Sequence, residues 1–142
     1  MKKFMIRLAI GIHIFLFRIS GSKIGNRIAR LDVLLLTTKG SKTGKPRTIP
    51  LGYLEDNSDY VIIASSGGSE KHPAWFFNLK SNPQVTIEVK GKAMQAIAEP
   101  AVAENRKRLW SKLIEVAPLY ERYQRRTARE IPLVLLHPIS KM

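Results

Sequence analysis

The chain has 142 residues, enough for one domain with one core. Apolar residues make up 44% of it, which excludes a disordered tail, and the lack of cysteine excludes a disulfide scaffold, a thiolate metal site and a cysteine nucleophile. The 24 Lys and Arg against 11 Asp and Glu give a formal charge of +13, which favours nucleic acid, an anionic membrane or a polyanionic small molecule as partner.

Residues 1–19 form an apolar segment that begins with two lysines and is interrupted by Arg7, His13 and Arg18. It is too short and too charged for a membrane-spanning helix, and the residues after it make a poor signal-peptide cleavage site. Two interpretations stay open: an amphipathic helix that packs on the core or on a partner subunit, or one that lies on a membrane surface. We treat it as separate from a domain over residues 20–142.

The next third of the chain predicts three strands. Residues 32–38 are a short apolar, β-branched run, and residues 47–54 and 60–65 resemble it. Glycine and proline break the first run at residues 40–46, and the Asp-Asn-Ser-Asp sequence at 56–59 is typical of a turn. Ser65 to Gly68 is a flexible connection to the next element.

A short helix is expected over residues 74–81, because Pro73 suits a first helical turn. Strands follow at 85–89 and 93–98, then a helix at 101–116 and a last strand at 131–136. About six strands with flanking helices, and no strict alternation of strand and helix, predict an α+β domain built on a small barrel and argue against a Rossmann fold.

The loop from Gly40 to Arg47 is the first candidate binding site. Two glycines lie among the four cations of residues 39–47, and Ser41 and Thr43 add hydroxyl groups. Glycine allows backbone N–H groups to approach an anion closely. The spacing differs from a Walker loop, since Pro46 stands where Ser or Thr belongs. The alternative is a solvated basic hairpin.

A second anion-binding corner is expected where Ser65 to Gly68 precedes the helix that starts near Pro73. Trp75 can flank a flat ring there, or it can belong to the core. Tyr120 and Tyr123 are three residues apart, so a helix places them on one face, where tyrosine can donate a hydrogen bond or a proton to a reacting oxygen. Gln124, Thr127 and several arginines accompany the pair, and the alternative is an exposed amphipathic turn.

No metal site is expected, because His13, His72 and His137 are far apart in the sequence. A nucleophile elbow of the G-x-S-x-G type is also absent from the sequence. Hydrolase and metalloenzyme chemistry therefore have little support.

Three stretches together resemble the deazaflavin-dependent nitroreductase family, which includes the F-420-dependent quinone reductases. They are LLLTTKGSKTGKPRTIPL at 34–51, YVIIASSGGSEKHPAWFFNLKSNPQV at 60–85 and PLYERYQRRTAREIPLVLLHP at 118–138. The resemblance implies a split β-barrel of the FMN-binding type and the anionic coenzyme F-420, with FMN as the alternative cofactor. It also implies three catalytic residues: Tyr120 and Tyr123, which face the acceptor, and Ser65, which lies beside the coenzyme ring. The implied coenzyme contacts are Ser41, Lys42, Thr43, Gly44, Arg47, Pro50, Ser65, Ser66, Gly67, Gly68, Pro73, Ala74, Trp75 and Asn78.

The activity that the resemblance implies is hydride transfer from the reduced deazaflavin to a small-molecule acceptor such as a quinone, an enone or a nitroaromatic. The alternatives are an FMN-binding split-barrel protein and a basic, non-enzymatic nucleic-acid-binding domain, although no nucleic-acid motif is present and no nucleic acid is expected as partner. We expect a cytoplasmic monomer or homodimer, in which residues 1–19 either pack on the protein or make peripheral contact with the inner face of the cell membrane.

Overall fold

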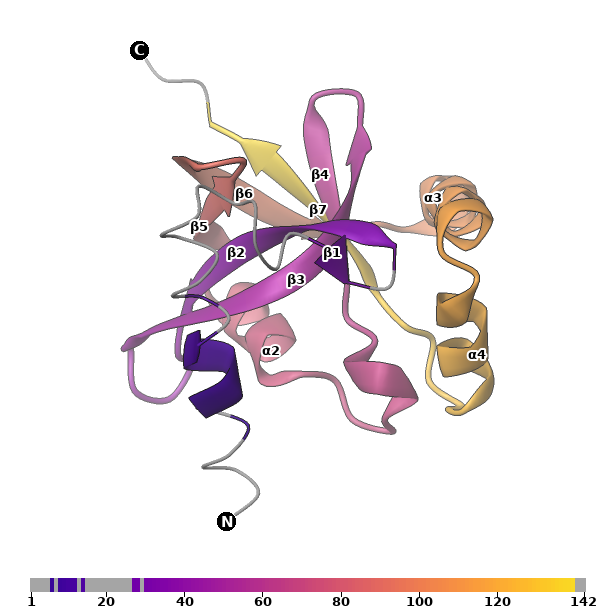
Figure 1. Ribbon diagram of the computed structural model, residues 1–142, viewed down its shortest axis with the longest axis horizontal. Coiled ribbons are helices and arrows are strands. Elements are labelled where there is room, and N and C mark those ends of the chain that lie inside the picture. Colours follow the sequence, from indigo (N-terminus) through magenta and orange to yellow (C-terminus); the bar gives the residue numbers. More distant parts are fainter. Residues whose placement is uncertain (1–5, 7, 13, 15–26, 29, 140–142) are drawn as a thin grey trace.

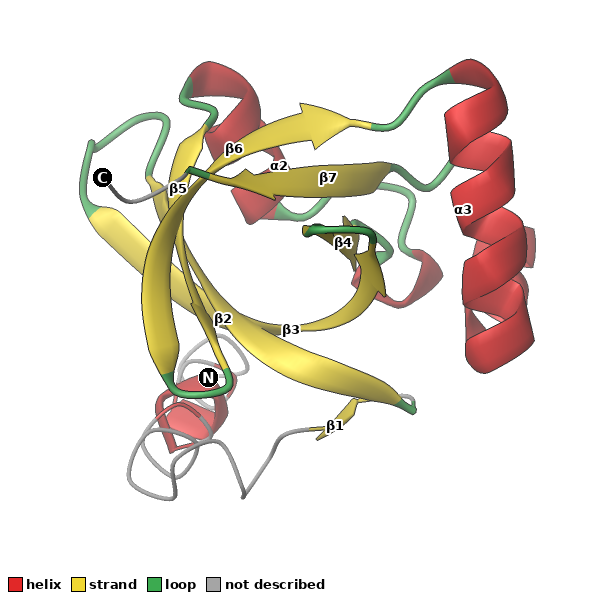
Figure 2. Cartoon of the chain, turned by 90° about the horizontal axis from the view of Figure 1, so that it is seen from above, coloured by secondary structure: helices red, strands yellow, loops and turns green. Residues whose placement is uncertain are grey.

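The computed structural model describes residues 6, 8–12, 14, 27–28 and 30–139. Six of its seven strands curve into a closed antiparallel barrel (Figures 1 and 2). Their order around the barrel is β2 (Leu31–Lys39), β3 (Pro46–Asp56), β4 (Asp59–Ile63), β7 (Leu133–Pro138), β6 (Lys92–Pro100) and β5 (Gln84–Val89), and β5 pairs again with β2. The two-residue β1 (Arg27–Ile28) pairs with the start of β2. The expected α+β fold on a six-stranded barrel is confirmed.

Four helical segments accompany the barrel: η1 (Ser66–Gly68), α2 (Ala74–Ser81), α3 (Ala103–Val116) and α4 (Leu119–Arg125). The long helix begins two residues later than expected, because the N–H of Ala101 bonds to Leu133 O and continues the extended chain of β6. The last strand begins at Leu133 rather than Ile131, since the N–H of Ile131 is taken by the Gln124 side chain.

Strands β2, β4 and β7 are apolar on both faces because both faces are covered. Ile62 of β4 points into the barrel, where the residues of α2 close the core, whereas Val61 and Ile63 face outward. The outward residues pack under α3 and α4 together with Leu109, Leu113 and other apolar side chains. Two-sided burial explains why these strands appear in the sequence as continuous apolar runs instead of strict alternation.

The N-terminal residues that the structure describes are helical and lie against the barrel. Ile14 packs on Val33 and Leu35, which form the outer face of β2. Three apolar residues of this helix, Ile6, Leu8 and Ile12, are exposed. The rest of residues 1–19 lies outside the described residues, and within the described part of the chain no helix is long and apolar enough to cross a membrane.

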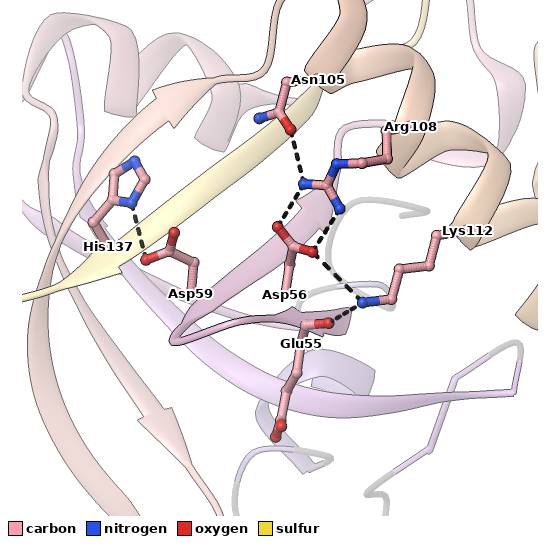
Figure 3. A network of polar contacts seen from close by, with 7 residues as sticks. All are labelled: Glu55, Asp56, Asp59, Asn105, Arg108, Lys112 and His137. Carbon is pink, nitrogen blue, oxygen red and sulfur yellow. Dashed lines mark hydrogen bonds and ion pairs between the residues drawn. The ribbon is translucent and has the colours of Figure 1, made fainter.

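A polar network fastens α3 to the hairpin between β3 and β4 (Figure 3). Arg108 donates two hydrogen bonds of 2.8 Å to the carboxylate of Asp56, and Lys112 Nζ donates to the carbonyl oxygen of Glu55 at 2.6 Å. The Asp56 side chain is only 10% exposed. Hydrogen bonding from Arg108 and the charges of Arg108 and Lys112 hold the pKa of Asp56 below its usual value of 3.8.

Replacing Asp56 with Asn is expected to lower the free energy of unfolding by about 1.5–3 kcal/mol at neutral pH, the range for hydrogen bonds to a charged group. Because the folded-state pKa is depressed, this contribution is present above the unfolded value of 3.8 and is lost as the pH falls through the lower, folded-state pKa. Urea unfolding of both proteins at several pH values measures the difference.

Glu55→Gln is the matched control. The Glu55 side chain is 56% exposed and meets Lys90 at 3.5 Å, so its loss is expected to change stability by less than about 1 kcal/mol. An equal loss in both variants would contradict a special role for the Asp56 carboxylate.

Candidate active site

A cavity of about 860 Å³ opens where the β2–β3 loop, the start of α2 and the N-terminal helix meet. The loop contributes Gly40, Ser41, Lys42 and Thr43, and the beginning of β3 contributes residues 46–49. Helix α2 and the residue before it contribute Pro73, Ala74, Trp75, Phe77 and Asn78. The N-terminal helix forms the remaining wall with Ile10, Gly11 and Ile14.

The β2–β3 loop is a closed turn. The N–H of Gly40 donates to Lys45 O at 2.8 Å, and the N–H of Gly44 donates to Gly40 O at 2.8 Å. Gly44 has a φ of 71°, in the left-handed region that glycine adopts without strain. Two backbone hydrogen bonds thus close the turn, and the side chains of Lys42, Lys45 and Arg47 are exposed and available to a ligand.

Asn78 connects this loop to α2. Its Oδ1 accepts the N–H of Ser41 at 3.0 Å, and its Nδ2 donates to Thr38 Oγ1 at 3.1 Å. Both polar side chains are buried, Asn78 to 7% exposure and Thr38 to 2%. Buried polar groups with satisfied hydrogen bonds are rigid, so this pair fixes the loop relative to the helix.

The chemistry of the lining suits a ligand with one anionic end and one flat apolar end. Lys42 and Arg47 line the cavity, and no Asp or Glu does so among the described residues. The opposite walls are apolar and include Trp75, Phe77 and Ile49. A phosphate near the cations and a ring against the aromatic wall therefore fit the residues present.

The structure brings eight of the predicted coenzyme residues to this cavity: Ser41, Lys42, Thr43, Arg47, Pro73, Ala74, Trp75 and Asn78. Gly44 shapes the loop without lining the cavity, and Pro50 is buried in β3 opposite Leu35. Trp75 lines the cavity and also belongs to the core, with 5% exposure, so the two alternatives given for it above do not exclude each other.

Ser65, Ser66, Gly67 and Gly68 do not line this cavity. They form η1 and the residue before it, on the far side of α2 from the β2–β3 loop in the view of Figure 1. Gly68 has a φ of 83°, and a Cβ on it would lie 2.6 Å from Tyr123 O. Only glycine allows η1 to approach α4 so closely.

Tyr120 and Tyr123 are on α4, as the helical spacing predicts, and their rings meet edge to face at 5.5 Å. Tyr120 is 5% exposed and packs in the outer core with the residues of α3. Burial, and then the neighbouring Tyr123, raise the pKa of Tyr120 to about 12, so its hydroxyl keeps its proton at neutral pH. Neither tyrosine lines the 860 Å³ cavity.

Several lining residues were missed from the sequence. Phe77 had a usable signal, because Ala74, Phe77 and Asn78 follow the helical spacing of one face. Thr48 and Ile49 continue β3 directly beyond Arg47. The wall formed by Ile10, Gly11 and Ile14 had no such signal, since nothing local relates the N-terminus to a loop about thirty residues away.

The fold and the cavity define a small barrel protein with a site for an anionic, ring-bearing ligand. Residues 10–138 match the sequence profile of the F420H(2)-dependent quinone reductases. An F420H(2)-dependent quinone reductase of Mycobacterium tuberculosis is 41% identical over 129 residues, which cover 88% of this chain and 87% of the relative.

Two solved structures are also similar. An F420-H2 dependent reductase has a TM-score of 0.68 and 39% identity, with 74% of this chain and 93% of that chain covered. A structure described as a domain-swapped dimer has a TM-score of 0.70 and 32% identity, with 96% of each chain covered. The chain belongs to the F420H(2)-dependent quinone reductase family, and the expected split-barrel fold is confirmed.

Replacing Asn78 with Ala is expected to release the β2–β3 loop, because the N–H of Ser41 loses its acceptor and Thr38 loses its buried donor. The free energy of unfolding should fall by about 1–3 kcal/mol, and the amide of Ser41 should exchange faster with solvent in hydrogen-exchange measurements.

Ser81→Ala, at the exposed end of the same helix, is the control and should change neither quantity. Unchanged exchange at Ser41 in the Asn78 variant would show that the loop holds its position without this bridge.

Proposed function

We propose that this chain transfers a hydride from reduced coenzyme F-420 to a quinone, and that the cavity beside the β2–β3 loop holds the coenzyme. The observation that carries the proposal is the cation-bearing loop, fixed by the buried amide of Asn78, at one end of an apolar cavity. Membership of the F420H(2)-dependent quinone reductase family supports the same conclusion. The bound deazaflavin supplies the hydride, and the protein supplies binding, orientation and a dry surface.

The residues of the cavity have separate roles in this proposal. Lys42 and Arg47 bind the coenzyme phosphate through charge-assisted hydrogen bonds, and Gly44 gives the loop its shape. Trp75 and Ala74 lie along the coenzyme ring and exclude water from one side of it.

Tyr120 and Tyr123 are proposed to face the acceptor, as the family resemblance implies. A tyrosine hydroxyl is protonated at neutral pH, and burial raises the pKa of Tyr120 further, to about 12, so in this proposal it donates a hydrogen bond to the acceptor oxygen. Ser65, at the end of β4 next to η1, is proposed to lie beside the coenzyme ring, with Ser66, Gly67 and Gly68 near its anionic tail.

Quinones are the acceptor class that the family supports. Enones and activated nitroaromatics are narrower proposals, since they accept a hydride by the same chemistry. A homodimer is proposed rather than a monomer, because one similar solved structure is a domain-swapped dimer that covers 96% of this chain.

Arg47→Ala should weaken binding of oxidised coenzyme F-420 by about tenfold to a hundredfold, which corresponds to one lost charge-assisted hydrogen bond. Quenching of the coenzyme fluorescence on titration with protein measures the dissociation constant.

Lys45→Ala is the matched control, because it removes one charge from the same loop at a residue that does not line the cavity. It should weaken binding only slightly and only at low salt. Equal effects of the two variants would reduce Arg47 to a general electrostatic role, and binding of FMN in place of F-420 would overturn the coenzyme assignment.

Peripheral membrane contact is proposed for the exposed side of the N-terminal helix. Ile6, Leu8 and Ile12 are 58%, 49% and 52% exposed, while Ile10 and Ile14 face the cavity. Apolar side chains of this kind, next to the lysines at the start of the chain, suit an anionic lipid surface.

Changing Ile6, Leu8 and Ile12 together to Ser should abolish flotation with liposomes that contain anionic lipid, because the apolar contact with the bilayer is removed. The cavity wall formed by Ile10 and Ile14 stays intact, so coenzyme binding should be unchanged. Val102→Ser, at a 70% exposed apolar residue elsewhere, is the control. Equal flotation of all three proteins, or flotation of none, would exclude this membrane contact.

A further inference from the structure

The side chain of Arg129 ends in a set of backbone carbonyls that belong to another part of the chain. Its Nε donates to Ser69 O at 2.8 Å, Nη2 donates to Ser65 O at 2.9 Å, and Nη1 donates to Ala64 O at 3.2 Å. Nη1 also lies 3.0 Å from Nδ1 of His72. One guanidinium therefore bonds four groups of the segment from Ala64 to His72, which connects β4 to α2.

The backbone of Arg129 is itself held in place. Gln124 of α4 donates from Nε2 to Arg129 O at 2.7 Å and accepts the N–H of Ile131 at 2.9 Å through Oε1. The N–H of Arg129 also donates to Thr127 Oγ1 at 3.3 Å, so two side chains close the turn after α4. Arg129 projects from a fixed base, so ordering its long side chain costs less than it does on a free loop.

The same segment meets α4 directly. Gly68 approaches Tyr123 O so closely that a Cβ would clash, and Arg126 donates to Gly67 O at 3.3 Å. The segment is therefore held at its beginning, its middle and its end. Pro73 follows it directly, lines the proposed coenzyme cavity and precedes the first residue of α2.

We propose that Arg129 is a positioning residue: it sets the path of residues 64–72 and, through them, the place of α2 against the coenzyme. The inference rests on the proposed function only in naming the coenzyme as the ligand that α2 contacts. Arg129 touches no lining residue of the 860 Å³ cavity and acts through the connecting segment.

His72 makes this contact depend on pH. Arginine keeps all its protons, so Nδ1 of His72 has to accept, and the proton of the neutral ring is on Nε2. The ring packs against Phe76 and Phe77, at centroid distances of 4.7 and 5.7 Å. Burial, then the charges of Arg129 and Lys80, lower the pKa of His72. Protonation of His72 places a second cation against Arg129 and weakens the contact between these two side chains.

Arg129→Gln and Arg129→Lys are the first test, because neither side chain can reach three carbonyls. Coenzyme F-420 should bind about tenfold more weakly to both, as expected for loss of one well-placed interaction. Amide exchange of residues 73–78, measured without coenzyme, should be faster. Both measurements are made well below the melting temperature.

Arg106→Gln is the matched control, since Arg106 also donates to a backbone carbonyl, that of Ile131 at 2.7 Å, but on the α3 side. It should lower the melting temperature without changing coenzyme affinity or exchange at 73–78. If the Arg129 variants behave like this control, Arg129 is a purely structural residue and the proposal is overturned. If the unchanged protein fails to bind F-420, the coenzyme assignment falls, while the exchange data still decide the role of Arg129.

His72→Asn is the second test and does not depend on how well the arginine variants fold. Its amide oxygen can accept from Arg129 without titrating. Between pH of about 7.5 and about 5, exchange at residues 73–78 relative to an unfolded reference should rise in the unchanged protein and stay flat in the variant. Identical pH profiles would exclude a role for the His72–Arg129 contact.

Discussion

The constraint on which the rest of the structure depends is that the central strands are apolar on both faces. A small barrel can hide only the inward side chains, such as Ile62 and Val134, so the outward ones need a second cover. Helices α3 and α4 supply it over β4 and β7, and the N-terminal helix supplies it over β2. Burial of each apolar side chain is worth about 1.5–3 kcal/mol, so the covers are as necessary as the barrel. The cavity proposed for the coenzyme lies where the N-terminal helix, α2 and the β2–β3 loop meet.

This constraint also explains which parts of the fold the sequence predicts. The strands and the helices α2 and α3 are predicted from local sequence, because the apolar runs, prolines and turn residues that define them lie within a few residues of one another. The ends of the helices and strands depend on contacts with residues that are distant in the sequence. The N–H of Ala101 pairs with Leu133 O, and that of Ile131 pairs with the Gln124 side chain, so the neighbours in space decide where the helix begins and the strand starts.

The candidate site also has one part that can be predicted from the sequence and one part that cannot. The loop from Gly40 to Arg47 is visible in the sequence because its glycines and cations are contiguous. The contact that holds the loop is not visible in the sequence, because Ser41 and Asn78 are 37 residues apart. The sequence predicts only that Asn78 contacts the coenzyme ring, whereas the structure shows its amide bonded to Ser41 and Thr38. Arg129 is 64 residues from Ser65, and no spacing rule connects an arginine to three carbonyls.

Several of the positively charged side chains have a structural role in addition to their charge. With 24 cations and 11 acidic residues, most arginines and lysines cannot find a carboxylate. Arg126 and Arg129 donate to backbone carbonyls in turns, where regular secondary structure provides no partner. Arg106 and Lys112 also donate to backbone carbonyls, in addition to their ion pairs with Glu130 and Asp56. These cations are structural donors, and their charge is partly offset by the carbonyl dipoles that they meet. The formal charge of +13 therefore overstates the charge that is free to bind an anion, and in the β2–β3 loop Lys42 and Arg47 line the cavity.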